Sequence, residues 1–186
     1  MELVEGDKYM NIDKLISFVE LYYKDKDIMH NMWHMKMVKN QIDKILKLNS
    51  FDINYDDLIY AMYFHGFIYS NEKEIIQFLK NNNVDNTRIE KIVKIAWESQ
   101  RNEIPETLEG KILHDAHVLE GGKTYLIVKT LITGSVRGQS LEETLKYMKE
   151  NVLDKNKCYL KETISLCDEM NKYANKFYQD LINGIY

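Results

Sequence analysis

The sequence predicts one all-helical domain, and three features of its composition indicate this fold class. The chain has 186 residues, of which 45 % are hydrophobic, enough for a single domain with a buried core. It contains one proline and eight glycines, so obligatory breaks are few. Leu, Ile, Lys, Glu and Met are plentiful, which favours helices over strands. We therefore expect the functional side chains to project from helices.

Apolar residues in the first half of the chain recur every three or four positions, which predicts amphipathic helices. The stretches between these patterns are rich in Asn, Asp and Ser, which are turn formers. Thr87 and Glu90 have the spacing of a capping box and predict that a fifth helix begins there. The four preceding helices are expected over about 11–23, 28–48, 55–69 and 71–79.

Proline and glycine divide the middle of the chain. Pro105 suits the first turn of a sixth helix, which we expect to reach Leu119 and to stop at the glycine pair that begins at Gly121. Residues 124–133 form a segment that looks buried, and 134–138 (GSVRG) is the most loop-like stretch of the sequence.

Two further helices are expected to close the domain. Ser140 with Glu143 forms a second capping-box pattern, and a long helix from about Lys155 carries one continuous apolar face. We expect residues 1–186 to form one domain, with a core of about 11–135 and closing helices over about 140–183.

Charge and cysteine usage restrict the class of protein. The formal charge is −4, so there is no broad positive field for DNA or RNA. No signal-peptide pattern opens the chain, and its longest apolar run is too short for a bilayer, so we expect a cytoplasmic protein that has no membrane partner. Cys158 and Cys167 lie in one predicted helix, about 13 Å apart in rise, which a disulfide does not span. They are expected to be reduced core residues.

Three polar side chains lie on otherwise apolar helix faces in distant parts of the chain. His34 continues a stripe through Val38, while His65 and Asp115 stand on the inward faces of the third and sixth predicted helices. A buried carboxylate is costly without a cation, and neutral imidazoles need partners as well. A bound metal would satisfy all three groups, whereas any single inward histidine is more often a hydrogen-bonded core residue.

The order of these residues resembles the H…HD…D pattern of the HD metal-dependent phosphohydrolase superfamily. MHNMWHMKMV (29–38) is similar to its first motif and AMYFHGFIY (61–69) to its second. ETLEGKILHDAHVLEGG (106–122) resembles the stretch TxEAKILxDADRLDALGA of nucleotide-pyrophosphohydrolase-like members, and YLKETISLCDEMNKYANKFYQDL (159–181) resembles their closing helix. The resemblance covers most of the chain and implies an HD-type helical bundle.

Members of that superfamily hold a divalent metal with two histidines and two aspartates, and the metal activates water for attack on phosphorus. The resemblance therefore implies that His34, His65 and Asp115 bind a divalent ion, namely Mn, Mg, Co, Ni, Fe or Zn. The chain departs from the pattern where Gly66 replaces the second aspartate, where Met37 replaces a common Arg, and where His117 and Val118 replace the Asp and Arg of DADRL. Three protein ligands can still hold a metal with open positions.

Other side chains could complete such a site, although solvent exposure explains each of them more simply. Candidate substitute ligands are His30, His114, His117, Glu98 and Glu72. Glu98 stands where many members place another histidine, and it is the preferred general base or water-orienting carboxylate. The candidate phosphate-binding cations are Lys36, Lys111, Arg101 and Arg137.

The leading functional hypothesis is a metal-dependent phosphohydrolase acting on a nucleotide or a similar small phosphate ester. The alternative is an inactive HD-like domain that binds a nucleotide or a protein partner, which Gly66, Met37 and Val118 favour. A helical interaction module is a third hypothesis, based on the amphipathic closing helix. A homo-oligomer is compatible with all three.

Overall fold

The computed structural model describes residues 11–100 and 102–186, and these residues form nine helices and no strand. The predicted all-α fold class is therefore confirmed. The first six helices are α1 (Ile12–Tyr23), α2 (Met32–Ile45), α3 (Tyr55–Phe64), α4 (Ile68–Asn81), α5 (Asn86–Glu98) and α6 (Leu108–Val118). The last three are α7 (Tyr125–Val136), α8 (Leu141–Asn151) and α9 (Ile164–Ile185).

Side-chain caps fix where several of these helices begin. The capping box of Ser140 and Glu143 opens α8 as predicted. The predicted box of Thr87 and Glu90 is wrong, because the cap of α5 lies two residues earlier, where the Asp85 side chain accepts a hydrogen bond from the Arg88 amide. An aspartate side chain satisfies the free amides of the first turn as well as a threonine does.

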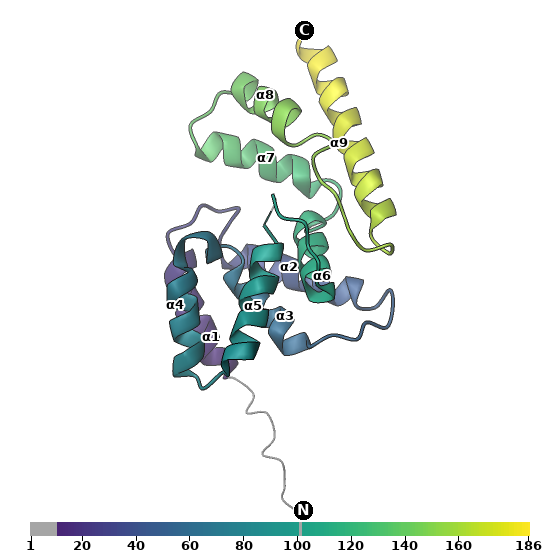
Figure 1. Ribbon diagram of the computed structural model, residues 1–186. Coiled ribbons are helices and arrows are strands. Elements are labelled where there is room, and N and C mark those ends of the chain that lie inside the picture. The colour runs from purple at the N-terminus through teal and green to yellow at the C-terminus, as the bar shows by residue number, and fades with distance from the viewer. Residues whose placement is uncertain (1–10, 101) are drawn as a thin grey trace, which may run out of the picture.

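Helices α1 to α6 form the lower part of the molecule (Figure 1). Within it, α3 packs against α5, and α6 packs against both α2 and α5. The shared core is made of fully buried apolar side chains, including Leu58, Ala61, Met62, Ile92, Ile95 and Ile112. Burial of this set is the main stabilising contribution in this part of the fold.

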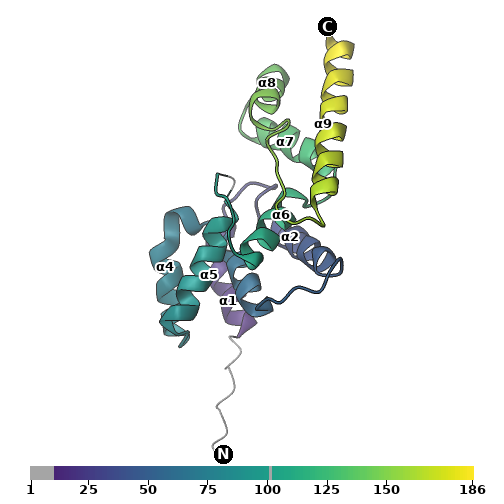
Figure 2. The same cartoon turned by 45° about the vertical axis from the view of Figure 1, so that its right-hand side comes forward.

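Helices α7, α8 and α9 form a second layer above α2 and α6 (Figure 2). They have a separate apolar cluster that includes Ile127, Met148 and Ala174. The prediction of a loop over 134–138 is wrong in its first half, since α7 continues to Val136. A β-carbon at Gly134 would lie 2.2 Å from Thr144 Oγ1, so this glycine allows α7 and α8 to approach closely.

Three other predicted boundaries differ from the structure. Helix α2 begins at Met32, so His30 lies in the preceding turn. Pro105 lies before the Thr107 cap of α6 rather than in its first turn. Helix α9 begins at Ile164, so Cys158 belongs to an irregular segment rather than to the same helix as Cys167. The two free thiols pack near each other beside Leu119, instead of lying on one helical stripe.

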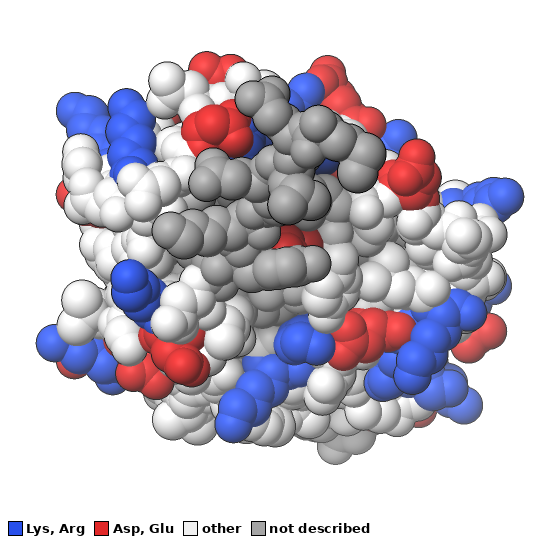
Figure 3. Space-filling model, turned by 90° about the horizontal axis from the view of Figure 1, so that it is seen from below, with Lys and Arg blue, Asp and Glu red and all other residues white. Residues whose placement is uncertain are grey.

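The exposed surface mixes charges of both signs. Lys and Arg side chains are interspersed with Asp and Glu side chains over the face seen from below, outside its grey part (Figure 3). Among the described residues, no helix combines the length and the apolar character needed to cross a membrane.

Candidate metal centre

Three imidazoles from three helices converge on one point of the fold. His34 lies in the first turn of α2, His65 directly follows α3, and His117 lies in the last turn of α6. One ring nitrogen of each lies within 4.8 Å of the other two. The structure thus brings together two of the three predicted ligands with one of the candidate substitutes. We call these residues the histidine cluster.

The outer nitrogens of two of these rings are committed to hydrogen bonds. His34 Nδ1 lies 2.5 Å from a Glu120 carboxylate oxygen, and His65 Nδ1 lies 2.5 Å from the Met62 carbonyl oxygen. An ionised carboxylate and a carbonyl only accept hydrogen bonds, so both Nδ1 atoms donate. In neutral rings both Nε2 atoms then carry lone pairs, and they face each other at 3.1 Å. Two acceptors so close need a proton or a metal cation between them.

Burial disfavours protonation of the three histidine rings. Desolvation lowers the pKa of His65 to about 4, although its hydrogen bond to Met62 acts in the opposite direction. Desolvation, followed by the charges of neighbouring histidines and Lys129, also lowers the pKa values of His34 and His117. Near pH 7 the rings are therefore neutral, which is the form that binds metals.

The spacing of the nitrogens suits a metal. At ordinary metal–nitrogen distances, an Nε2–Nε2 separation of 3.1 Å corresponds to an N–metal–N angle of about 95–100°. Such an angle lies between those of octahedral and tetrahedral coordination. The hydrogen bonds to Glu120 and Met62 are the outer contacts that usually fix the tautomer of ligating histidines. The donor set of the histidine cluster therefore fits a divalent transition metal.

Asp115 does not join this cluster, contrary to the prediction from the sequence. Its side chain is fully buried and its carboxylate accepts hydrogen bonds from the amides of Tyr159 and Leu160 at 2.9–3.0 Å. The Thr163 hydroxyl donates a further bond of 2.6 Å. These bonds compensate the buried charge without a metal, so Asp115 connects α6 to the segment that leads into α9.

Glu98 also has a structural position rather than the predicted catalytic one. Its buried carboxylate accepts hydrogen bonds from the amides of Glu106 and Thr107 and from the Thr107 hydroxyl. A β-carbon at Gly110 would lie 1.8 Å from Glu98 Oε2, so the glycine leaves room for this carboxylate. Glu98 thereby holds the loop that leads into α6, and it is not part of the cavity wall described below.

The remaining candidate ligands have partners of their own. Glu72 accepts a 2.6 Å hydrogen bond from the Trp97 indole. His114 packs edge-on against Tyr159. His30 Nδ1 lies 2.8 and 2.9 Å from the two carboxylate oxygens of Asp27. None of these three belongs to the histidine cluster of the described residues.

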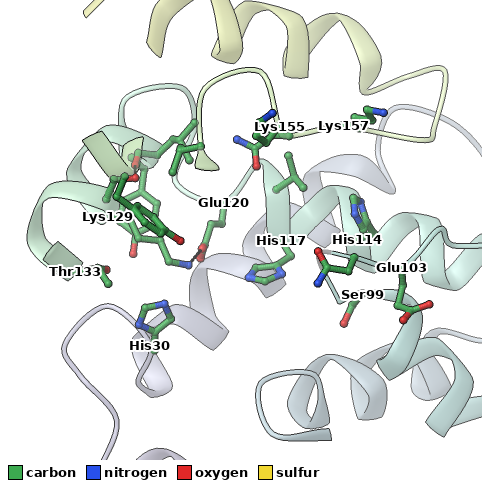
Figure 4. A pocket seen from close by; sticks show the side chains of 18 of the residues that line it. His30, Ser99, Glu103, His114, His117, Glu120, Lys129, Thr133, Lys155 and Lys157 are labelled. Carbon is green, nitrogen blue, oxygen red and sulfur yellow. Dashed lines mark hydrogen bonds and ion pairs between the residues drawn. The ribbon is translucent and has the colours of Figure 1, made fainter. Parts of the chain in front are cut away.

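A cavity of about 480 Å³ opens beside the histidine cluster, and His117 forms part of its wall. His30 and Thr133 lie on one side of this cavity, and His114, Ser99 and Glu103 lie on the other side, with His117 between them (Figure 4). Glu120 also lines the cavity, where it forms an ion pair with Lys129 while holding His34. The cavity is of the size that commonly holds small ligands.

Four cationic side chains of the described residues line this cavity, namely Lys129, Arg137, Lys155 and Lys157. Only Arg137 was among the predicted phosphate-binding residues. Lys36 and Lys111 lie outside the cavity wall, and Arg101 lies outside the described residues.

The sequence prediction also missed Glu120 and Lys129. Glu120 stands opposite the last aspartate of the DADRLD stretch that this segment resembles, which is a signal that could have indicated it. Lys129 carries no comparable signal, because it was expected in a buried segment of unassigned structure.

Comparison with known proteins finds one similar fold but indicates no activity. No family model matches the chain, and no curated protein matches it. Among solved structures, the chain is similar to the crystal structure of the Lin1889 protein from Listeria innocua, with a TM-score of 0.66 and 20 % sequence identity. The match covers 92 % of this chain and 96 % of that one. At this identity the likeness establishes an all-helical fold of the same kind and nothing about chemistry.

Proposed function

We propose that this protein is a metal-dependent phosphohydrolase of the HD type, acting on a nucleotide or another small phosphate ester. The observation that carries the proposal is the pair of Nε2 atoms of His34 and His65, which face each other at 3.1 Å with both Nδ1 atoms engaged elsewhere. The order of the two histidines in the sequence supports the HD assignment, as does the all-helical fold.

The histidine cluster would hold a divalent metal through three neutral ligands. A metal at this place would supply a Lewis acid and a source of hydroxide near neutral pH. Because the direct ligands are neutral, they would not compensate the two positive charges of the ion, and the Glu120 carboxylate behind His34 is already paired with Lys129. The site would therefore attract anionic substrates more strongly than one with two aspartate ligands.

The cavity supplies the other requirements of a phosphate ester. Lys155 and Lys157 line it as exposed cations without an ion pair to any described residue, so they are available to a phosphate group. Within the described chain, Glu103 and Glu120 are its only acidic lining residues. Glu120 is occupied by His34 and Lys129, and we assign it the role of orienting His34 rather than that of a general base.

The proposal is tested by metal analysis and by phosphate release. The chelator-treated protein is reloaded with manganese, magnesium, cobalt or nickel, and phosphate release from nucleotides and sugar phosphates is measured. We expect turnover with at least one metal, and loss of both metal and turnover in His65→Ala and His117→Ala. His114→Gln is the matched control for metal content, because this histidine lies on the same helix as His117 but outside the histidine cluster.

The same measurements separate the alternatives. A protein that binds metal and nucleotide without phosphate release under any metal would be a binding domain. A protein that binds no metal in any form would contradict the proposed centre, since the Nε2 pair would then be held by a proton.

A further inference from the structure

Helix α7 presents a row of polar side chains to the cavity. Tyr125, Lys129, Thr133 and Arg137 are spaced by four residues, and all four line the cavity. Four-residue spacing places side chains on one face of a helix. Lys129 and Thr133 lie on the side of the cavity near His30 (Figure 4). We call these four residues the α7 ladder.

Two hydroxyls of the α7 ladder have no partner within the described chain. Tyr125 Oη and Thr133 Oγ1 are both buried without a hydrogen bond. An unpaired buried hydroxyl is unfavourable, so a native protein rarely leaves one without a ligand or water. Thr130 lines the same cavity, but its hydroxyl donates to the Leu126 carbonyl at 2.8 Å. The unsatisfied polar groups among the described lining residues are therefore these two ladder hydroxyls and the side-chain amide nitrogen of Asn156.

The guanidinium group of Arg137, at the end of the α7 ladder, is also available to a ligand. Arg137 is exposed and forms no ion pair with any described residue. The nearby carboxylate of Asp27 is occupied by His30 Nδ1, at 2.8 and 2.9 Å. The C-terminal end of a helix carries roughly half a negative charge, which the full charge of the arginine outweighs.

We propose that Thr133 and Arg137 form a subsite for a second anionic group of the substrate, reached directly or through one ordered water. Both side chains offer hydrogen-bond donors. The matching group is rich in acceptors, such as a phosphate or a carboxylate. That this group belongs to a substrate rests on the proposed function.

The length of the α7 ladder restricts the substrate further. Lys129 marks the end near the histidine cluster, because it binds Glu120, which in turn binds His34. Thr133 and Arg137 lie about 6 and 12 Å further along the helix axis. The two anionic groups are therefore separated by a spacer about as long as a sugar unit. Adjacent phosphates of one chain are too close together to reach both positions.

Binding of non-hydrolysable probes tests this subsite without turnover. Hexane-1,6-bisphosphonate, the dicarboxylate suberate and the short methylenebisphosphonate are titrated calorimetrically into chelator-treated protein and into manganese-supplemented protein. The first two probes distinguish a phosphate-type from a carboxylate-type second group. We expect the hexane probe or suberate to bind more tightly than methylenebisphosphonate in both preparations.

Two variants and two controls locate the binding. Thr133→Val should weaken the preferred long probe about tenfold, and Arg137→Ala should weaken it by more. Thr130→Val, whose hydroxyl already has a partner, and Lys146→Ala, an exposed cation on α8, should bind within about twofold of the wild type.

Equal affinities in the ladder variants and the wild type would overturn the subsite, even if the protein is an active phosphohydrolase. Equal losses in Thr130→Val would overturn it as well. If instead no ester is hydrolysed while the long probe still depends on Thr133 and Arg137, the subsite stands and the proposed function does not.

Discussion

Gly66 and Tyr23 share one space in the fold, because a β-carbon at Gly66 would lie 2.4 Å from the Tyr23 hydroxyl oxygen. That hydroxyl donates to the Tyr63 carbonyl and accepts from the Gly66 amide, each at 3.2 Å. Lys26 donates to the Gly66 carbonyl at 2.5 Å. The position next to His65, where the HD pattern has an aspartate, is thus filled by a tyrosine from α1.

Gly66→Asp should therefore destabilise the protein rather than simply restore a ligand. Overpacking of this kind costs about 1–3 kcal/mol of unfolding free energy. Tyr23→Phe in the same chain removes the closest atom and should recover part of the loss, which a double-mutant cycle by urea unfolding measures. Gly66→Asp with wild-type stability would show that Tyr23 moves freely, contrary to its burial.

Glu120→Gln should weaken metal binding at the proposed centre while leaving its three histidines in place. The carboxylate that accepts from His34 Nδ1 fixes its tautomer, and loss of such outer contacts typically costs about 10–100-fold in metal affinity. Competition with a fluorescent chelator gives the dissociation constant. Glu103→Gln is the control, since Glu103 lines the cavity as an exposed side chain outside the histidine cluster. An unchanged constant for Glu120→Gln would remove the orienting role.

Asp115→Asn should lower stability but preserve metal affinity. The substitution weakens a group of charge-assisted hydrogen bonds to Tyr159, Leu160 and Thr163 in a fully buried position. We expect a loss of about 2–4 kcal/mol by denaturant unfolding, against less than about 0.5 kcal/mol for the exposed Asp180→Asn. A large loss of metal affinity in the folded variant would return Asp115 to the ligand set.

The metal-free protein should lose stability as the pH falls below about 6.5. The pKa of His65 is about 4 in the folded state, against 6.5 for an unperturbed histidine, so the unfolded state binds the proton more readily between these values. Stability from this ring is therefore present above pH 6.5 and is lost towards pH 4. At pH 5 this ring alone contributes a loss of about 2 kcal/mol.

Urea unfolding between pH 7.5 and pH 5 measures this loss before most carboxylates titrate. His34 and His117 act in the same direction, because their pKa values are lowered as well. His65→Gln should flatten the profile. A profile that is flat in the wild type would mean that the rings bind protons as readily in the folded state as in the unfolded state.

The helices could be predicted from the sequence because apolar periodicity is a local property. Eight of the nine helices in the described residues correspond to predicted helices, whereas α7 lies in the unassigned segment and the predicted loop. The restart expected at Asn71 corresponds to a kink there inside α4. The exceptions have physical reasons. Gly134 indicates a loop when it is considered alone, but in the fold it is the contact point of α7 with Thr144. Contacts between helices do not leave such a local trace.

The candidate site could be predicted only in part, and α6 shows why. Asp115 and His117 are two positions apart, so their side chains point about 200° apart around the helix axis. Only one of them can face His34 and His65. Helix α6 is buried over nearly its whole circumference, from Glu109 to Ala116, so apolar periodicity does not reveal which side faces the site. The resemblance favoured the aspartate, and the structure places the histidine there.

Helix α6 therefore positions two side chains with separate roles, since Asp115 attaches the segment before α9 and His117 completes the histidine cluster. Deleting one residue upstream within the helix would turn both side chains by about 100°. This rotation would move the Asp115 carboxylate away from the amides of Tyr159 and Leu160. It would also move His117 away from the rings of His34 and His65. Both the attachment of the upper layer and the assembly of the histidine cluster therefore depend on the same rotational register of α6.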